Sequence, residues 1–448
     1  MVHFLELAYF LLVIKAILRC LYFWQLKEYR LDRFRSFLTT SEVKRFLLPT
    51  RFFLRPRLTL KAFILTWLAF YFSFQILKFD IQSIAVFATY LLIPLTSSLA
   101  VLALTPITSL AYWLIIMLAK IKLQLFHQPL QVIGITGSFG KTSTKEILAH
   151  LLSVKYSVCK TPATRNTAIG IALTILKDLK KDHQFFVIEM GAYKKGEIKQ
   201  ICRLVKPSYG ILTGITKQHL SLFGSLDKII EAKYELIQSL PASGLAIVNA
   251  DNPHSFKLSK QTKSVKVKTY LKPKTKYQTN LIGHYQQLNI QAAIVLARHL
   301  NINLKALRVK LTSVPSFKTA VTSKIGLNKA LIINDSYNSN PEGFKALIDY
   351  AKTQPTKTKI LITSGIIELG ADSNKIHQEL ISLAETVFDQ VIITKKDLSF
   401  LASNKTTIET NHKKLYNYLK QKLDSNTLVL LESRLPQKLI VQLWLNQS

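Results

Sequence analysis

The stretch that decides the fold of most of this chain is QVIGITGSFGKTSTKEILAHLL, residues 131–152. It begins with an apolar run typical of a buried β-strand, 131–136, and ends in a segment with apolar residues at helical spacing. A strand that enters a helix through a glycine-containing turn offers backbone N–H groups and a helix N-terminus to phosphate. Lys141 adds a full positive charge, and the Thr142 hydroxyl suits Mg²⁺. We therefore predict a nucleotide phosphate site, whose binding residues are Gly137, Ser138, Gly140, Lys141, Thr142 and Ser143.

The pattern of a strand followed by a helix continues from residue 129 to the end of the sequence. Short apolar runs that favour β-strands alternate with amphipathic segments of helix length. This alternation indicates an α/β architecture, in which parallel sheets are covered by helices. We expect a central domain over 129–312 and a C-terminal domain over 313–448. The β-type runs are QVIGIT, FFVIEM, YGILTGI, GLAIVNA, ALIINDS, KILITSG, QVIITK and TLVLLE.

The N-terminal part, residues 1–128, is apolar enough to suggest an α-helical membrane region. Residues 81–119 contain no charged side chain, and such a run can cross ~30 Å of hydrocarbon. We expect residues 61–79 to cross outward and 82–104 to cross inward, with Pro94 and Pro106 breaking the run. Residues 106–125 would lie on the cytoplasmic face or re-enter it. Residues 4–24 form either a further span or an interfacial helix.

Charge sets the expected orientation and the expected partners. The formal net charge is +34, although 48% of the residues are hydrophobic. Residues 25–60 hold nine Lys/Arg against three Asp/Glu, so the positive-inside rule places this loop, and the α/β domains after it, in the cytoplasm. No aromatic–basic repeat supports nucleic-acid binding, and the lysines are better explained by contact with anionic membrane lipids. Three cysteines exclude a disulfide framework.

Five sequence blocks, in order, carry a resemblance to a known family. The loop TGSFGKTSTK is similar to the ATP loop of the Mur ligases, which form amide bonds in peptidoglycan precursors. Two of the blocks, INDSYNSNP and SGIIELG, resemble the branch of this family that uses D-alanyl-D-alanine as its amine. The four blocks after the loop are VIEMGAYKKGEI (187–198), ILTGITKQHLSLFGSLDKIIEAKYEL (211–236), INDSYNSNP (333–341) and SGIIELG (364–370).

The resemblance implies a Mur-type central ATP-binding domain, a Rossmann-like C-terminal domain and a specific chemistry. The expected enzyme is a ligase that couples ATP hydrolysis to amide formation through an acyl phosphate, and it would add D-alanyl-D-alanine to a muramoyl peptide. Two Mg²⁺ sites are expected, the second of them held by Lys233 as a carbamate made from CO₂. The implied catalytic residues are Lys141, Glu189, His219 and Lys233, and the metal ligands are Thr142, Glu189, His219 and Lys233.

The resemblance also implies further contacts with the nucleotide and with the substrate. Asn166, Asn289 and Asp335 would contact ATP. Asn340 could instead cap a helix, because Pro341 suits the first helical turn. The residues expected on the substrate side are Tyr337, Asn338, Asn340, Glu368 and His377.

Departures from the family pattern leave other functions open. Membrane segments stand where the resembled enzymes hold the UDP-sugar, and the usual P-G-R reads Pro315-Ser316-Phe317. One alternative is a membrane-bound ligase that acts on a lipid-linked precursor or a polyglutamate-like polymer with a different amine. Another is a non-catalytic membrane scaffold that retains nucleotide binding, although the intact set of site residues argues against it.

Overall fold

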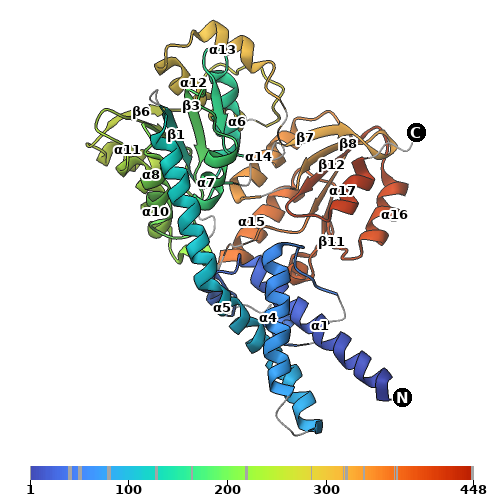
Figure 1. The fold of residues 1–448 in the computed structure, drawn as a ribbon. Helices are drawn as coiled ribbons and strands as arrows, with labels where there is room; N and C mark the ends of the chain where they lie inside the picture. Colours follow the sequence, from blue (N-terminus) through green and yellow to red (C-terminus); the bar gives the residue numbers. More distant parts are fainter. Residues whose placement is uncertain are drawn as a thin grey trace. The chain divides into compact units, whose positions relative to one another are not determined.

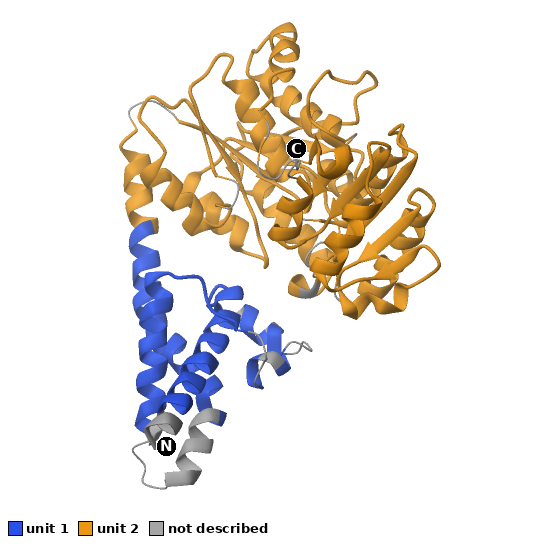
Figure 2. Ribbon diagram, turned by 90° about the vertical axis from the view of Figure 1, so that its right-hand side faces the viewer, with its two compact units in different colours: residues 1–115 blue, residues 116–448 orange. Residues whose placement is uncertain are grey.

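The computed structural model separates the chain into two compact units (Figure 2), residues 1–115 and residues 116–448. The boundary falls inside helix α5 (Gln82–Gln124), upstream of the boundary at 128 that the sequence suggests, because this helix continues from the apolar region into the second unit. The structure describes residues 2–38, 43–48, 53–77, 82–126, 130–162, 165–216, 220–283, 285–315, 317, 321–336, 339–367, 369 and 372–444.

The first unit consists of helices that pack around an aromatic cluster. Its helices are α1 (Val2–Leu26), α2 (Leu31–Leu38), α3 (Val43–Leu47), α4 (Leu60–Leu77) and the N-terminal part of α5. Trp24 of α1 stacks on Phe34 of α2 with 3.6 Å between ring centroids, and Phe46 of α3 meets the Phe34 ring edge-on. Within the basic stretch, helices α2 and α3 therefore pack against α1 through Phe34 and Phe46, which the charge pattern did not predict.

Helix α5 runs through both prolines that were expected to break it. Pro94 and Pro106 lie inside this 43-residue helix, and the Ser98 hydroxyl donates to the Pro94 carbonyl at 2.7 Å. Among the described residues, Leu7–Leu26 and Leu91–Gln124 are long and apolar enough to span a membrane, whereas the apolar part of α4 is shorter. Buried core helices and signal sequences share these properties, so a membrane role remains a proposal.

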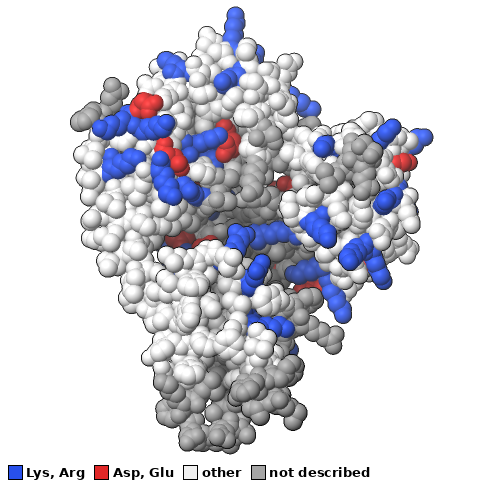
Figure 3. Space-filling model, turned by 45° about the vertical axis from the view of Figure 1, so that its right-hand side comes forward, with Lys and Arg blue, Asp and Glu red and all other residues white. Residues whose placement is uncertain are grey.

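Large apolar side chains lie on the surface of the first unit. Trp67 of α4 is 62% exposed and Trp113 of α5 is 57% exposed. On the face shown in Figure 3 the described surface of these helices is mostly uncharged, while Lys and Arg side chains are spread over the α/β unit. An exposed apolar surface of this kind is typical of a protein or membrane contact.

The second unit contains two six-stranded sheets (Figure 1), as the alternating sequence pattern predicts. The first sheet is entirely parallel, and its strand order is β2-β3-β1-β4-β5-β6. Helices α6, α12 and α13 contribute to the core on one face, and the side chain of Leu236 in α10 packs at Gly134 on the other. The strands are β1 (Gln131–Thr136), β2 (Val158–Lys160), β3 (Phe185–Glu189), β4 (Tyr209–Leu212), β5 (Leu245–Asn249) and β6 (Lys266–Tyr270). The helices are α6 (Lys141–Leu152), α7 (Ala168–Lys177), α8 (Glu197–Val205), α9 (Leu220–Phe223), α10 (Leu226–Gln238), α11 (Pro253–Gln261), α12 (Tyr285–His299) and α13 (Leu304–Leu311).

The second sheet has the order β11-β10-β9-β12-β8-β7 and is parallel except for β7 at its edge. Helices α14 and α15 cover one face, and α16 and α17 cover the other. The strands are β7 (Thr322–Ile325), β8 (Leu331–Asp335), β9 (Thr358–Thr363), β10 (Gln390–Ile393), β11 (Thr406–Ile408) and β12 (Thr427–Glu432). The helices are α14 (Pro341–Lys352), α15 (Ser373–Glu385), α16 (His412–Lys422) and α17 (Gln437–Trp444), with short 3₁₀ turns at Leu327–Lys329 and Lys396–Leu401.

Two of the helices that cover this sheet, α14 and α16, begin at an asparagine whose side chain caps the helix. The Asn340 side chain accepts a hydrogen bond from the Gly343 N–H at 3.0 Å, and Pro341 occupies the first turn of α14. Asn411 caps α16 in the same way, accepting from the N–H groups of Lys413 and Lys414. The cap interpretation of Asn340 is therefore confirmed by the structure.

We expect Asn340→Ala to destabilise α14 by about 1 kcal/mol, because the first-turn N–H groups lose their acceptor. Hydrogen–deuterium exchange should show faster exchange at the Gly343 amide, while Asn340→Ser should keep it protected. Asn411→Ala is the matched control, since it should loosen α16 and leave α14 as it is. Unchanged protection of Gly343 in Asn340→Ala would contradict the cap.

Candidate active site

The turn between β1 and α6 has the geometry of a phosphate loop. Gly137 and Gly140 adopt φ angles of 148° and 72°, which favour glycine. A Cβ on Gly137 would lie 2.1 Å from Thr213 Oγ1, and a Cβ on Gly140 would lie 2.4 Å from Asn289 Oδ1. The Ser138 N–H donates to the Gly214 carbonyl at 2.7 Å. The loop is thus pinned against the segment that follows β4.

The loop ends at the N-terminus of α6, where Lys141 begins the helix. Gly140 occupies the cap position and has no side chain with which to satisfy the first-turn N–H groups, so they are available to an anion. The Lys141 ammonium donates to the Ser138 carbonyl at 3.2 Å. Burial lowers the pKa of Lys141, and the nearby Glu189 carboxylate opposes that shift. This arrangement can hold phosphate.

Glu189 lies at the carboxyl end of β3, where two other predicted site residues form hydrogen bonds with its carboxylate. The Thr142 hydroxyl donates to its Oε2 at 2.8 Å, and Asn166 Nδ2 donates to its Oε1 at 3.2 Å. The Glu189 N–H donates to Thr161 Oγ1 at 3.1 Å, which anchors the strand end. Glu189 as a whole is only 3% exposed.

The donor set around Glu189 fits Mg²⁺. A carboxylate and a hydroxyl are hard oxygen donors, and Mg²⁺ is commonly held by one or two carboxylates together with substrate phosphates and water. Within the described part of the chain, no cluster of three His, Cys, Asp or Glu side chains forms a closed cage. An ion at Glu189 and Thr142 would therefore complete its coordination with phosphate oxygens and water.

Lys233 is buried on α10, 3% exposed, and it faces the same region. Its ammonium lies 5.8 Å from the centroid of the Phe223 ring on α9. Burial, reinforced by the positive charge of Lys141, lowers the pKa of Lys233 to about 7, while Glu197, Glu189 and Glu235 act in the opposite direction. A lysine with such a pKa is partly neutral near pH 7. His219, the fourth predicted catalytic residue, lies outside the described residues.

Asn289 supports the phosphate loop from α12. Its Oδ1 accepts from the Thr144 hydroxyl at 3.4 Å, and its Nδ2 donates to Gln286 Oε1 at 3.1 Å. It is 5% exposed. The structure therefore places Asn289 beneath the loop, where it contacts α6.

Asp335 ends β8 beside Glu432, which the sequence analysis did not single out. The two residues are paired in the register of β8 and β12. Ser339 donates to Glu432 Oε1 at 2.5 Å, and Ser433 donates to its Oε2 at 2.7 Å. Burial raises the pKa of Glu432 to about 7, and burial together with the Glu432 charge raises the pKa of Asp335. An acid directly after the apolar run TLVLL was the available signal.

The predicted substrate-side residues are only partly described. His377 is 4% exposed, and its ring binds backbone: Nε2 accepts from the Ile366 N–H at 2.9 Å and Nδ1 donates to the Ser373 carbonyl at 2.7 Å. It ties the segment after β9 to α15. Its expected substrate contact stays a prediction. Three other predicted residues, Tyr337, Asn338 and Glu368, lie outside the described residues.

Lys145 is a site residue that sequence reasoning missed. It is fully buried on α6, with its ammonium 3.1 Å from Glu146 Oε1 and 3.7 Å from Glu189 Oε2. The available signal was its spacing, because residues four apart lie on the same helix face and Lys145 follows Lys141 by four.

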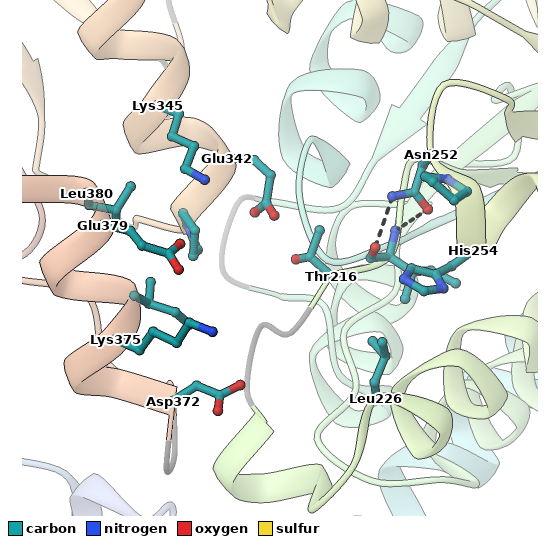
Figure 4. A pocket seen from close by; sticks show the side chains of 14 residues that line it. Thr216, Leu226, Asn252, His254, Glu342, Lys345, Asp372, Lys375, Glu379 and Leu380 are labelled. Carbon is teal, nitrogen blue, oxygen red and sulfur yellow. Dashed lines mark hydrogen bonds between the residues drawn. The ribbon is translucent and has the colours of Figure 1, made fainter. Parts of the chain in front are cut away.

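A cavity of 440 Å³ opens between the loops at the carboxyl ends of β4 and β5 and the helices α14 and α15 (Figure 4). Asn252 fixes one wall, since its Oδ1 accepts from the Ile215 N–H at 3.1 Å and its Nδ2 donates to the Ile215 carbonyl at 3.0 Å. The opposite wall has charges of both signs, including Lys345, Lys375 and Glu379. Such a lining can receive a ligand that carries both an amine and a carboxylate.

Comparison with known proteins agrees with this geometry. Residues 135–276 match the Mur ligase middle domain, and residues 320–434 match the Mur ligase glutamate ligase domain. A MurF ligase from Thermotoga maritima, solved in complex with ADP, superposes with a TM-score of 0.64 at 27% identity, covering 72% of this chain and 80% of that one. A MurF from Acinetobacter baumannii gives a TM-score of 0.66 at 24% identity, over 74% of this chain and 80% of its own, which shows the shared fold.

Sequence relatives carry the name UDP-N-acetylmuramoyl-tripeptide–D-alanyl-D-alanine ligase. The Synechocystis protein is 32% identical over 56% of this chain, and the Buchnera aphidicola protein is 30% identical over 65% of it. The chain spans 58% of the length of the first relative and 70% of the second. The phosphate loop, the two matched domains and the Buchnera relative together establish that this chain belongs to the Mur ligase family.

Proposed function

We propose that the chain is an ATP-dependent, ADP-forming ligase of peptidoglycan precursor synthesis, which joins D-alanyl-D-alanine to the carboxylate of a muramoyl peptide. The observation that carries this proposal is the buried Glu189 carboxylate beside the phosphate loop, which accepts hydrogen bonds from Thr142 and Asn166 and whose charge acts on the pKa of both Lys141 and Lys233. The sequence relatives are named for the same reaction. We assign ATP binding to residues 129–312 and presentation of the amine to residues 313–448.

The reaction would proceed in two steps. The substrate carboxylate attacks the γ-phosphorus of ATP, and an acyl phosphate and ADP form. The amine of the dipeptide then attacks the acyl carbon, loses a proton and expels phosphate as the amide bond forms. Side chains contribute mainly by positioning and by neutralising charge.

The chain's own groups support both steps. The loop N–H groups and Lys141 hold the phosphates, Glu189 and Thr142 supply oxygen ligands, and Mg²⁺ when bound neutralises charge on the phosphate oxygens. We propose that the partly neutral amine of Lys233 adds to CO₂ and releases a proton. The carbamate that results is an anionic ligand, and together with the His219 side chain it would hold a second ion. Asp335 and Asn166 lie at the strand end and loop where a nucleotide would be bound.

A second candidate function keeps this chemistry and changes the acceptor. The apolar helices α1, α4 and α5 precede the first residue matched to the family, Ile135. If they anchor the chain in the membrane, with the α/β unit in the cytoplasm, a lipid-linked muramoyl peptide would be held at high effective concentration. A different amine, or a polyglutamate-like polymer, belongs to this same alternative.

The acceptor test offers radiolabelled D-alanyl-D-alanine with ATP, Mg²⁺, bicarbonate, and either UDP-linked or lipid-linked muramoyl tripeptide. We expect label to enter an acceptor as ADP is released, and Lys141→Ala to lower the rate by at least about a hundredfold. Lys160→Ala, an exposed lysine outside the loop, is the matched control. Consumption of glutamate with no label in either acceptor would contradict the proposed amine, and label in the UDP-linked acceptor alone would exclude the lipid-linked one.

The carbamate proposal predicts dependence on bicarbonate and on pH. The neutral amine reacts with CO₂, so activity at limiting bicarbonate should rise as the pH increases through about 7, the pKa of Lys233. Carbon-13 NMR with labelled bicarbonate should show one carbamate carbon that is lost in Lys233→Ala and kept in Lys228→Ala, an exposed lysine of the same helix. Full activity without bicarbonate would rule the carbamate out.

The membrane proposal predicts that the full-length protein sediments with membranes and resists extraction by high salt, because apolar helices rather than surface charge hold it. A tag after residue 448 should be protected from protease in intact cells and cleaved after permeabilisation. Release by salt alone would indicate a peripheral contact, and cleavage in intact cells would reverse the topology.

A further inference from the structure

Lys145 has a fully buried ammonium with unused hydrogen-bonding capacity. Its Nζ forms no hydrogen bond to any described residue, and its nearest charged partners are two carboxylates, at 3.1 Å in Glu146 and 3.7 Å in Glu189. A buried charge is costly unless opposite charge compensates it. The position of Lys145 therefore depends on the carboxylates beside it.

The two carboxylates differ in what else surrounds them. Glu146 also pairs with Lys160, whose side chain is 43% exposed, so it has a second cation and access to solvent. Glu189 is buried, and the described side chains that donate to its carboxylate, Thr142 and Asn166, are both neutral. Of the lysines around Glu189, Lys145 is the one within ion-pair distance in the described residues. The Lys145 ammonium is nearer to Glu146, but Glu146 also has Lys160, so among the described residues loss of Lys145 would leave Glu189 with no lysine at ion-pair distance.

We propose that Lys145 is a positioning residue that serves as the resident counter-ion of Glu189 and makes divalent-cation binding conditional on the nucleotide. This inference rests on the proposed role of Glu189 as a magnesium ligand. A dication at Glu189 is repelled by the buried ammonium, whose field is weakly screened by solvent. The phosphates of ATP bring enough negative charge to outweigh that repulsion. The ion therefore enters with the nucleotide, and the metal alone is excluded.

The test measures Mn²⁺ binding by electron paramagnetic resonance, with full-length protein in detergent and bicarbonate-free buffer, with and without ADP. Without nucleotide, we expect Lys145→Met to bind Mn²⁺ about tenfold more tightly than the wild type, because the repulsion is gone. With ADP present the difference should shrink. Lys160→Met makes the same change on the other lysine that contacts Glu146 and should stay close to wild type.

Each outcome decides between interpretations. Unchanged or weaker Mn²⁺ binding by folded Lys145→Met, without nucleotide, would overturn the counter-ion role. If that variant fails to fold by circular dichroism, the double variant Lys145→Met/Glu146→Gln removes both charges and must show the same tightening. If the wild type binds no Mn²⁺ even with ADP, the magnesium role of Glu189 fails, and with it part of the proposed function.

Discussion

The candidate site depends on one buried carboxylate at the end of a parallel strand. β1 pairs with β3 so that Ile135 lies opposite Glu189, and this register places the carboxylate beside the start of the phosphate loop. Thr142 and Asn166 then bind its two oxygens. A buried acid of this kind must be compensated by donors and positive charge, and Lys145 of α6 lies 3.7 Å from it.

The second sheet also has carboxyl groups at the ends of neighbouring parallel strands. β8 and β12 end side by side in Asp335 and Glu432, and burial raises the pKa of both carboxyl groups. Ser339 binds Glu432 directly before the cap of α14, so the strand ends and the helix start are held together. In both sheets, parallel register collects polar groups from distant parts of the sequence at one edge, where open α/β sheets bind ligands.

The N-terminal unit is held together by packing of aromatic side chains between its helices. Its helices bury aromatic side chains such as Trp24 and Phe34 inside and expose others such as Trp67 and Trp113. α5 tolerates Pro94 and Pro106 without a break, and Lys122 near its end donates to the Leu176 carbonyl of α7 at 3.0 Å. The boundary between the two units therefore falls inside a single continuous helix.

The sequence by itself determined the α/β class and the phosphate loop, because these depend on local periodicity and on a short motif. It also predicted Lys141, Glu189 and Lys233 as a catalytic set, which the resemblance to the Mur ligases implied. It missed the continuity of α5, since Pro94 and Pro106 normally end a helix and only packing decides otherwise. It also missed Lys145 and Glu432, whose chemistry comes from burial beside another strand or helix. Strand register and burial are set by contacts between residues far apart in the chain, so only the tertiary structure could add Lys145 and Glu432 to the candidates.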